Sequence, residues 1–309
     1  MSVIVEADLT LINKLTKDIP GLPVAADTSR NIRRLGGLTN RSYHLVFADG
    51  EELVVRIPGE GTEAIINRKN EKISTELACE LGIDAKLIYF GDDGSKISKY
   101  IPGAVTMTAD QLRQPEVIKQ IAEVLAKIHH SGQDTGVPFN VFTMAEQYES
   151  IIADLRVPLF EDYEQTKESV SRIKGWLDQA IKPALQPCHN DPLCENWIMG
   201  RDKLYLVDWE YAGMNDGMWD LAAVSIEAEY DADCDRQLLA AYLGADNQLE
   251  AMHFLASKIF VDYLWTLWAK ARLPYGGQAM EDWAQKRYTR LKKFLAEFTG
   301  KAGGLGLML

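Results

Sequence analysis

The residues best suited to chemistry lie in two neighbouring polar segments. The first, CHNDPLCENWI at residues 188–198, places Asp191 five residues ahead of Asn196. The second, LYLVDWEYAG at residues 204–213, follows an apolar run with Asp208. Phosphoryl transfer needs a carboxylate to orient the attacking hydroxyl, together with oxygen ligands for Mg²⁺. The two segments therefore predict a phosphotransferase with Asp191 as the base and with Asn196 and Asp208 as Mg²⁺ ligands.

The first segment taken alone has a simpler interpretation. Asp and Asn favour turns, and the pattern taken alone fits simple turn formers better. The strand-like run before Asp208 and the β-rich region upstream favour the kinase-like interpretation. His189 is expected to brace the loop rather than take part in chemistry. Zinc binding by His189 with Cys188 and Cys194 does not match the spacing of common zinc sites.

The region that must support these segments begins with predicted strands at residues 30–100. Apolar runs flank Asp49-Gly50 and again Asp93-Gly94, and such dipeptides are strong hairpin signals. Between the two hairpins, residues 62–82 have helical periodicity, with Gly82 as a suitable stop. We therefore expect a small, β-rich lobe at residues 1–102, with its boundary near Pro102-Gly103.

From about Thr108 the pattern becomes mostly helical. One helix is predicted from the capping residue Thr108 to Gly132. Only the segments near residues 188–210 add strand-like pieces. The predicted fold class is therefore α+β, with a larger, mainly helical lobe at residues 103–309 that carries the catalytic loop and the acceptor site. The glycines of GKAGGLGLML, residues 300–309, predict a loose tail.

Composition narrows the possible partners. The 309 residues are 47% hydrophobic and 25% charged, as in an ordinary globular protein. A formal net charge of −12 argues against nucleic acid and anionic membranes as main partners. The four cysteines form no C-x-x-C pair, which favours free thiols in a reducing compartment. Residues 1–21 predict an amphipathic helix rather than a signal peptide. We expect a cytoplasmic protein without membrane insertion, whose oligomeric state is left open.

Several motifs resemble one family. CHNDPLCEN, LVDWEYAGMNDGMWDLA, and DYLWTLWAKAR with EDWAQKRY are similar to the choline/ethanolamine kinases, which belong to the aminoglycoside-phosphotransferase-like group of small-molecule kinases. VRIPGEGTEAIINRKNE resembles the bacterial choline kinases in particular. The resemblance runs from about Gly36 to Tyr288. It implies a two-lobed, protein-kinase-like fold that binds ATP and Mg²⁺.

The resemblance also implies a set of nucleotide-binding residues. Arg56 stands where protein kinases carry a Lys, and a guanidinium can hold phosphate oxygens bidentately. Its implied ion-pair partner is Glu71, and Glu76 is the less suitable candidate. RRLGGLTNRSYHL would cover the phosphates, and SKYIPG would meet adenine through its backbone. The residues implied in these two stretches are Gly37, Thr39, Asn40, Ser42, Lys99 and Ile101.

The acceptor end is predicted from aromatic residues. Trp265 and Trp268 stand three residues apart, so a helix would place them on one face. Trp283 follows, and three aromatic walls suit a quaternary ammonium, which has no N–H to donate. Core packing is the alternative role for such a pair. The resemblance implies that Glu227 faces the ammonium, with Tyr230 one turn further on the same helix.

Two acidic residues near the catalytic segments are expected to act as supports. The resemblance implies that Glu210 braces the metal loop or binds the metal indirectly, and that Asp220 fixes the catalytic loop by hydrogen bonds. The predicted activity is transfer of the γ-phosphoryl group of MgATP to choline. Ethanolamine, thiamine or an aminoglycoside is the alternative acceptor, and a non-catalytic choline- or nucleotide-binding pseudokinase is a further alternative.

Overall fold

The computed structural model describes residues 6–18, 32–35, 40–59, 66–244 and 247–304. Gly37 and Thr39 lie outside the described residues. Contacts between Cα atoms divide the chain into two units. The first unit is Met1–Thr108 with Cys194–Ala212, and the second is Ala109–Leu193 with Gly213–Leu309. The catalytic and metal-binding candidates are therefore divided, since Asp191 belongs to the second unit and Asn196 and Asp208 belong to the first.

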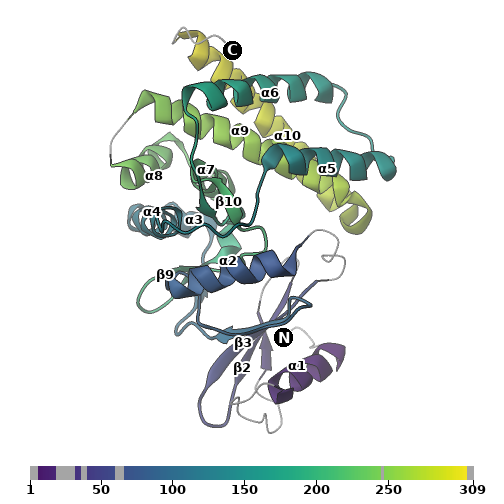
Figure 1. Cartoon of the computed structure of the whole chain (residues 1–309), viewed down its shortest axis with the longest axis vertical. Coiled ribbons are helices and arrows are strands. Elements are labelled where there is room, and N and C mark those ends of the chain that lie inside the picture. Colours follow the sequence, from purple (N-terminus) through teal and green to yellow (C-terminus); the bar gives the residue numbers. More distant parts are fainter. Residues whose placement is uncertain (1–5, 19–31, 36–39, 60–65, 245–246, 305–309) are drawn as a thin grey trace. The chain divides into compact units, whose positions relative to one another are not determined.

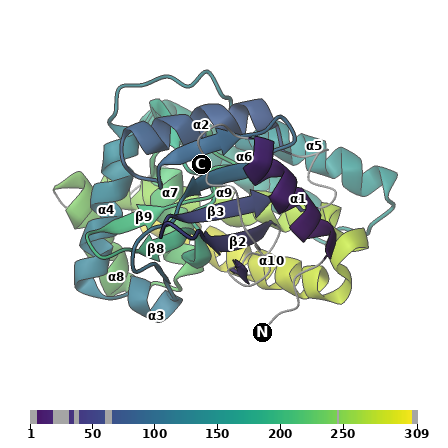
Figure 2. The same ribbon diagram turned by 90° about the horizontal axis from the view of Figure 1, so that it is seen from below.

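The first unit is built on a five-stranded antiparallel sheet (Figures 1 and 2). Its strand order is β1-β2-β3-β5-β4. β2 pairs with β3 and β5 pairs with β4, which confirms both predicted hairpins. The strands are β1 Ile32–Arg34, β2 Arg41–Val46, β3 Glu52–Ile57, β4 Leu87–Phe90 and β5 Lys96–Lys99.

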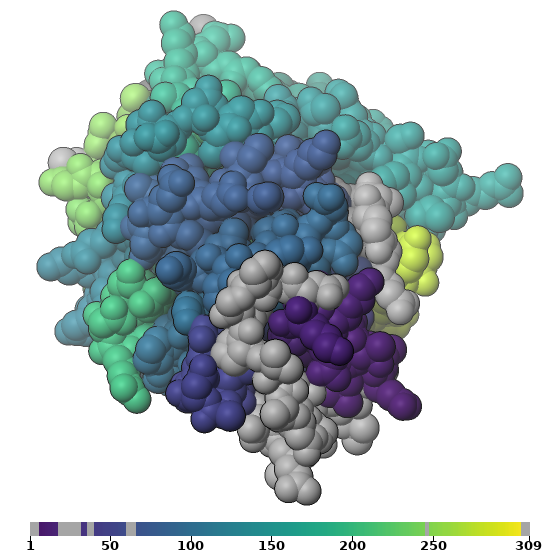
Figure 3. All heavy atoms as spheres, turned by 60° about the horizontal axis from the view of Figure 1, so that its bottom comes forward, coloured from purple at the N-terminus to yellow at the C-terminus, as the bar shows by residue number. Residues whose placement is uncertain are grey.

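Alternate residues of the strands are apolar and form a core, and one helix packs against this core. The inward side chains of β2, β3 and β5 include Tyr43, Val55 and Ile97, none of which is exposed. Helix α1, Glu6–Asp18, adds Ile12 to the same core. This confirms the amphipathic N-terminal helix, whose side chains Figure 3 shows in purple on one face.

Helix α2, Arg68–Glu80, carries the ion-pair candidate Glu71. The side chain of Asn67 caps it by accepting hydrogen bonds from the backbone N–H groups of Lys69 and Asn70, at 3.1 and 3.3 Å. This cap begins α2 at Arg68, and residues 62–65 of the predicted helix lie outside the described residues. The predicted stop is confirmed, because Gly82 follows the helix with φ of 64°.

A second, three-stranded sheet brings residues from far along the chain into the first unit. Its order is β6-β8-β9, with strands Val105–Thr106, Trp197–Met199 and Leu204–Leu206. Val105 pairs with Met199, and Trp197 pairs with Leu206. β9 ends just before Asp208, so this small sheet fixes the segment that carries the predicted metal ligands.

The second unit is mainly helical. Helix α9 packs against α5, α6, α7 and α10. Strands β7, Leu185–Cys188, and β10, Gly213–Asp216, form an antiparallel pair next to the catalytic segment. The helices are α3 Ala109–Leu112, α4 Pro115–His129, α5 Val141–Asp154, α6 Tyr163–Ala180, α7 Met218–Glu227, α8 Ala232–Leu243, α9 Gln248–Ala271 and α10 Leu273–Gly304.

Two predictions about these helices were wrong. The single helix from Thr108 to Gly132 is two helices, because Pro115 has no backbone N–H and begins a new helix at its first turn. The tail was also predicted to be loose from residue 300, yet α10 continues to Gly304, and residues 305–309 lie outside the described residues. Within the described ranges, no helix combines the length and apolarity needed to cross a membrane.

Candidate active site

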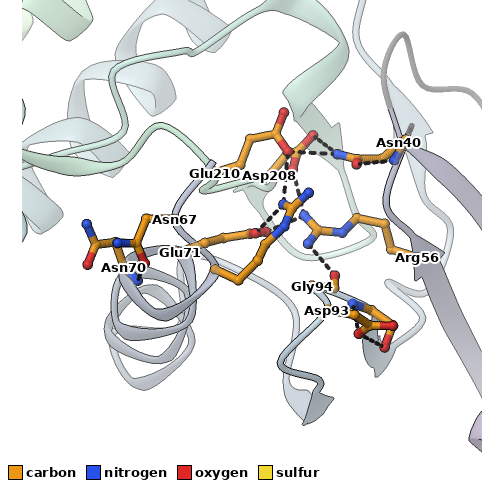
Figure 4. A network of polar contacts seen from close by, with 12 residues as sticks. Asn40, Arg56, Asn67, Asn70, Glu71, Asp93, Gly94, Asp208 and Glu210 are labelled. Carbon is orange, nitrogen blue, oxygen red and sulfur yellow. Dashed lines mark hydrogen bonds and ion pairs between the residues drawn. The ribbon is translucent and has the colours of Figure 1, made fainter. Parts of the chain in front are cut away.

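Arg56 is the centre of a polar network in the first unit (Figure 4). It lies on β3, is 4% exposed, and forms an ion pair with Glu71 of α2. Its Nη1 also lies 3.0 Å from Oδ1 of Asp208, and Nη2 donates a hydrogen bond of 2.8 Å to the carbonyl of Gly94. Glu76 instead lies 3.9 Å from Lys72 on the exposed side of α2. The ion pair of Arg56 with Glu71 is thus present in the fold.

The charge of Arg56 is held by its neighbours. Burial alone would lower the pKa of the guanidinium, but the carboxylates of Glu71 and Asp208 outweigh burial and raise this pKa above its ordinary value. Arg56 is therefore a permanent positive charge beside Asp208, a predicted metal ligand.

Asp208 adopts a backbone conformation that few residues tolerate. Its φ is 71°, in the left-handed region where Asp and Asn are enriched among residues other than glycine. The residues around it hold this turn: the Val207 N–H donates to the carbonyl of Asn196 at 3.0 Å, and the indole N–H of Trp209 donates to the carbonyl of Leu206 at 3.2 Å. Strained backbone of this kind clusters at functional sites.

Asn40 joins this turn to the first sheet. Its side-chain amide donates to Oε2 of Glu210 at 3.1 Å and to Oδ2 of Asp208 at 3.4 Å. Its amide oxygen accepts from the N–H of Gly59 at 3.4 Å. The resemblance gave Asn40 a role toward phosphate, whereas here its donors face the two carboxylates.

Glu210 is the most perturbed carboxyl of this network. Burial, and then the negative charge of Asp208, raise the pKa of Glu210 to about 7, while Arg56 acts in the opposite direction. The network thus concentrates more negative charge than its own arginines neutralise. Such a site is stabilised when a further cation binds.

The carboxylates fit a magnesium ion. One oxygen from each of Glu71, Asp208 and Glu210 lies within 4.8 Å of the others. Mg²⁺ is bound by such hard oxygen ligands, usually through one or two carboxylates. Glu71 already pairs with two arginines, so Asp208 and Glu210 are better suited to be ligands. Asn196, 8% exposed, ends a 3-10 helix at Cys194–Asn196 in the same unit.

Arg68 is a member of this network that the sequence did not reveal. Its Nη1 lies 2.7 Å from Oε2 of Glu71 and 3.6 Å from Oε2 of Glu210. The hairpin turn leaves room for it: a Cβ on Gly94, whose φ is 86°, would lie 2.4 Å from Nε of Arg68. The spacing of Arg68 and Glu71, one helical turn apart, was the available signal.

The predicted adenine contacts have other partners in this structure. The N–H of Lys99 donates to the carbonyl of Lys86 at 2.9 Å, and the carbonyl of Ile101 accepts from the N–H of Ala104 at 3.0 Å. Ser42 is on β2, directly opposite Arg56, and its carbonyl accepts from the N–H of Leu35 at 2.8 Å. An adenine contact by Lys99 and Ile101 stays a prediction.

In the second unit, Asp220 of α7 holds the catalytic segment. Its two oxygens accept hydrogen bonds of 2.7 Å from the backbone N–H groups of His189 and Asn190. Asp220 also lies 3.1 Å from Nε2 of His129, and both side chains are fully buried. This arrangement supports the bracing role of Asp220.

The segment itself turns at Asn190. The φ of Asn190 is 68°, and its carbonyl accepts from the indole N–H of Trp219 at 2.9 Å. The backbone N–H of Asp191 donates to Nδ1 of His189 at 3.2 Å, which places the buried imidazole under the loop. Asp191 is thus presented, half-buried, on a rigid turn that buried groups support.

Three tryptophans lie together in the second unit. The ring centroids of Trp265 and Trp268 are 6.1 Å apart, and those of Trp268 and Trp283 are 5.6 Å apart, both in edge-to-face arrangements. Trp265 is 4% exposed, whereas Trp268 and Trp283 are only half-buried. Half-buried aromatic rings in a row are suited to contact a small ligand.

Glu227 is joined to these rings by a residue that the sequence did not reveal. Glu227, the last residue of α7, forms an ion pair with Arg287 of α10. The guanidinium of Arg287 lies 4.0 Å from the centroid of the Trp283 ring. Its position four residues after Trp283 was the available signal, because such residues share a helix face.

The prediction that Tyr230 extends the α7 helix was wrong. The helix ends at Glu227, and Glu229 has a φ of 53°, which turns the chain away. The hydroxyl of Tyr230 donates a hydrogen bond of 2.6 Å to the carbonyl of Leu112. No glycine or proline marks this turn, so the sequence gives no sign of it.

Comparison with known proteins shows the family of this chain. The family model "Choline/ethanolamine kinase" matches residues 32–266, and the chain therefore belongs to the choline/ethanolamine kinase family. It is a small-molecule kinase with a kinase-like fold, a β-sheet in its N-terminal part and mostly helices in its C-terminal part.

Three similar proteins show which members of the family this chain resembles. A choline/ethanolamine kinase family protein from Mesorhizobium loti has a TM-score of 0.82 and 30% identity, over 94% of this chain and 96% of that one. Choline kinase LicA from Streptococcus pneumoniae has a TM-score of 0.76 and 30% identity, over 93% and 99%. Ethanolamine kinase 2 from Mus musculus is 28% identical over 80% of this chain and 70% of its own length.

Proposed function

We propose that this kinase transfers the γ-phosphoryl group of ATP to choline, giving phosphocholine and ADP. The observation that carries the choice of acceptor is the row of Trp265, Trp268 and Trp283, whose neighbouring ring centroids are 6.1 and 5.6 Å apart. A quaternary ammonium is bound through ring faces, and each such contact contributes about 0.5–2 kcal/mol. The similarity to choline kinase LicA supports the same acceptor.

Asp191 has the role of base. The hydroxyl oxygen of choline attacks the γ-phosphorus, the bond from that phosphorus to the β–γ bridging oxygen breaks, and the hydroxyl proton passes to the carboxylate of Asp191. The turn at Asn190, whose φ is 68°, and the hydrogen bonds that Asp220 accepts from the N–H groups of His189 and Asn190 hold the backbone that carries Asp191. Orienting the nucleophile accounts for a large part of catalysis in this reaction class.

The first unit has the role of holding the nucleotide phosphates. Arg56, oriented by Glu71, supplies positive charge to them. Asp208 and Glu210, with Asn196, would hold Mg²⁺, which neutralises the phosphate oxygens when it is bound. The raised pKa of Glu210, about 7, supports this assignment, because burial and Asp208 disfavour its charge until a cation is added.

Ethanolamine is the second candidate acceptor, and the similarity to ethanolamine kinase 2 is the observation that favours it. Its ammonium carries N–H donors and is bound best by oxygen acceptors. The first experiment compares phosphorylation of choline, ethanolamine, thiamine and kanamycin by ATP, with Mg²⁺ and with EDTA. We expect the largest kcat/KM for choline and no turnover in EDTA. A larger kcat/KM for ethanolamine would refute the choice of acceptor. Turnover of none of the four acceptors would refute the proposed reaction and favour the non-catalytic pseudokinase.

A further inference from the structure

Four charged residues form a continuous chain through the second unit. Glu227 of α7 pairs with Arg287 of α10. Nη1 of Arg287 lies 3.1 Å from Oδ1 of Asp262 on α9, one turn before Trp265. Arg290 completes the chain, because its Nε and Nη2 each donate a hydrogen bond of 2.7 Å to Asp262. Two carboxylates and two guanidiniums thus balance one another beside the tryptophans.

Arg287 is the member of this chain that touches the acceptor candidates. Its side chain is 2% exposed, while that of Glu227 is 18% exposed. The guanidinium contacts Glu227 on one side and covers a face of the Trp283 ring, with Cζ at 4.0 Å from the centroid. It therefore fixes the position of both a carboxylate and an aromatic wall, and it brings a permanent positive charge next to a site proposed for a cation.

A positive charge in this place affects two acceptors unequally. A primary ammonium is strongly hydrated, and it compensates the loss of water by placing its N–H groups within about 2.8 Å of carboxylate oxygens. Close approach to Glu227 also means close approach to Arg287. The nitrogen of a quaternary ammonium is kept further away by its methyl groups, which contact neighbouring carbon atoms at about 3.5–4.0 Å. It is also bound by ring faces rather than by directed hydrogen bonds.

We propose that Arg287 is a positioning and specificity residue, which orients Glu227 and Trp283 and disfavours primary ammonium acceptors relative to quaternary ones. The proposal rests on the proposed function, since it concerns the acceptor of the same reaction. Arginine suits the role better than lysine, because its planar group pairs with two carboxylates and stacks on an indole at the same time.

The test compares Arg287→Gln with a matched control, Arg290→Gln. Both arginines lie on α10 and contact Asp262, but Arg287 also pairs with Glu227 and covers the Trp283 ring, whereas Arg290 acts on Glu227 through longer-range charge. Steady-state kinetics with choline and with ethanolamine give the ratio of the two kcat/KM values. We expect Arg287→Gln to shift this ratio toward ethanolamine by about ten-fold, mainly through KM, because a removed like charge favours the closer-approaching cation. Arg290→Gln should leave the ratio within about two-fold.

A conservative variant separates charge from packing. Arg287→Lys keeps the positive charge, so the ratio should stay within about two-fold of the original although both KM values rise. This variant also serves if Arg287→Gln does not fold. An equal change for both acceptors in Arg287→Gln, or a shift in Arg287→Lys toward ethanolamine of about ten-fold, would overturn the proposal.

Binding measurements separate this proposal from the proposed function. Calorimetric titration with choline and with ethanolamine needs no turnover. If the unmodified protein binds both but phosphorylates neither, the proposed function fails, and the ratio of the two dissociation constants in Arg287→Gln still decides the role of Arg287. If the unmodified protein binds neither, both proposals fail.

Discussion

In the network around Arg56 in the first unit, two arginines face three carboxylates, whereas in the chain of charges through Arg287 in the second unit two arginines face two carboxylates. The surplus carboxylate of the first unit is visible in Glu210, whose pKa is raised to about 7 by burial and by Asp208. In the second unit, Asp262 and Glu227 each have a guanidinium partner. Under the proposed function, the first arrangement would receive a metal ion and a polyphosphate, and the second would receive a cation whose charge is spread over methyl groups.

The largest effect is expected at Asp191, which lies in the second unit but outside both charge networks. Asp191→Ala should lower kcat by about 10³-fold, because the hydroxyl loses both its orientation and its proton acceptor. Nucleotide binding should stay within about two-fold of the original, since Asp191 has no assigned contact with the nucleotide. Steady-state kinetics and calorimetric titration with ATP measure the two quantities. A large loss of ATP affinity would contradict the division of roles.

The arginine network of the first unit can be tested through two glutamates of one helix. Glu71→Gln should reduce stability by about 3 kcal/mol and weaken ATP binding, because it leaves the buried Arg56 without its main partner. Glu76→Gln is the matched control, since Glu76 is half exposed and pairs only at 3.9 Å with Lys72. Urea unfolding and ATP titration measure the effects. Equal effects of the two substitutions would refute the assignment of Glu71.

The tryptophan row of the second unit predicts a smaller, selective effect. Trp265→Ala should raise the KM for choline by about ten-fold, while the KM for ATP changes by less than about two-fold. The control is Trp176→Ala in α6, whose indole packs against Phe298 at 5.2 Å between centroids. That substitution should reduce stability without affecting the KM for choline. A similar rise in both KM values for Trp265→Ala would show that Trp265 packs in the core and does not contact choline.

The smallest expected effect concerns His253 of α9. Burial lowers the pKa of this imidazole, but Asp216 at 2.5 Å and Glu250 at 3.3 Å outweigh it and raise the pKa above 6.5. A raised pKa contributes stability that is complete below the unfolded value and is lost as pH rises through the folded value. The melting temperature of His253→Gln should therefore fall below that of the unmodified protein by about 2 °C more at pH 6 than at pH 9. A deficit that does not depend on pH would show that packing alone is affected.

What the sequence predicted well was local or came from strong patterns. The dipeptides Asp49-Gly50 and Asp93-Gly94 marked both hairpins, because few other residues accept the turns that they form. The spacing of Asp191, Asn196 and Asp208 predicts phosphoryl transfer, and the match to a kinase family agrees with that type of reaction. These features depend on backbone conformations or ligand types that only a few residue types can supply.

What the sequence did not reveal depends on neighbours that are distant in the chain. Arg68 and Arg287 looked like ordinary charged residues of helix surfaces, yet the side chain of Arg68 is only 10% exposed and that of Arg287 only 2%. Their partners Glu210 and Glu227 lie far from them in sequence, and charge pairs of this kind leave no periodic pattern. The end of α7 before Tyr230 was missed for a similar reason, since the turn at Glu229 carries no glycine or proline.

The assignment of residues 194–212 to the first unit has a consequence for synthesis of the protein. Val105 pairs with Met199, and the partner strand leaves the ribosome long after β6 does. At translation rates of about 5–20 residues per second, the delay is about 5–20 seconds. During that interval the N-terminal segment is incomplete, and its unpaired strand edge is open to wrong partners. Slow codons or chaperone binding within residues 109–193 would therefore lengthen the time for which β6 lacks its partner strand β8.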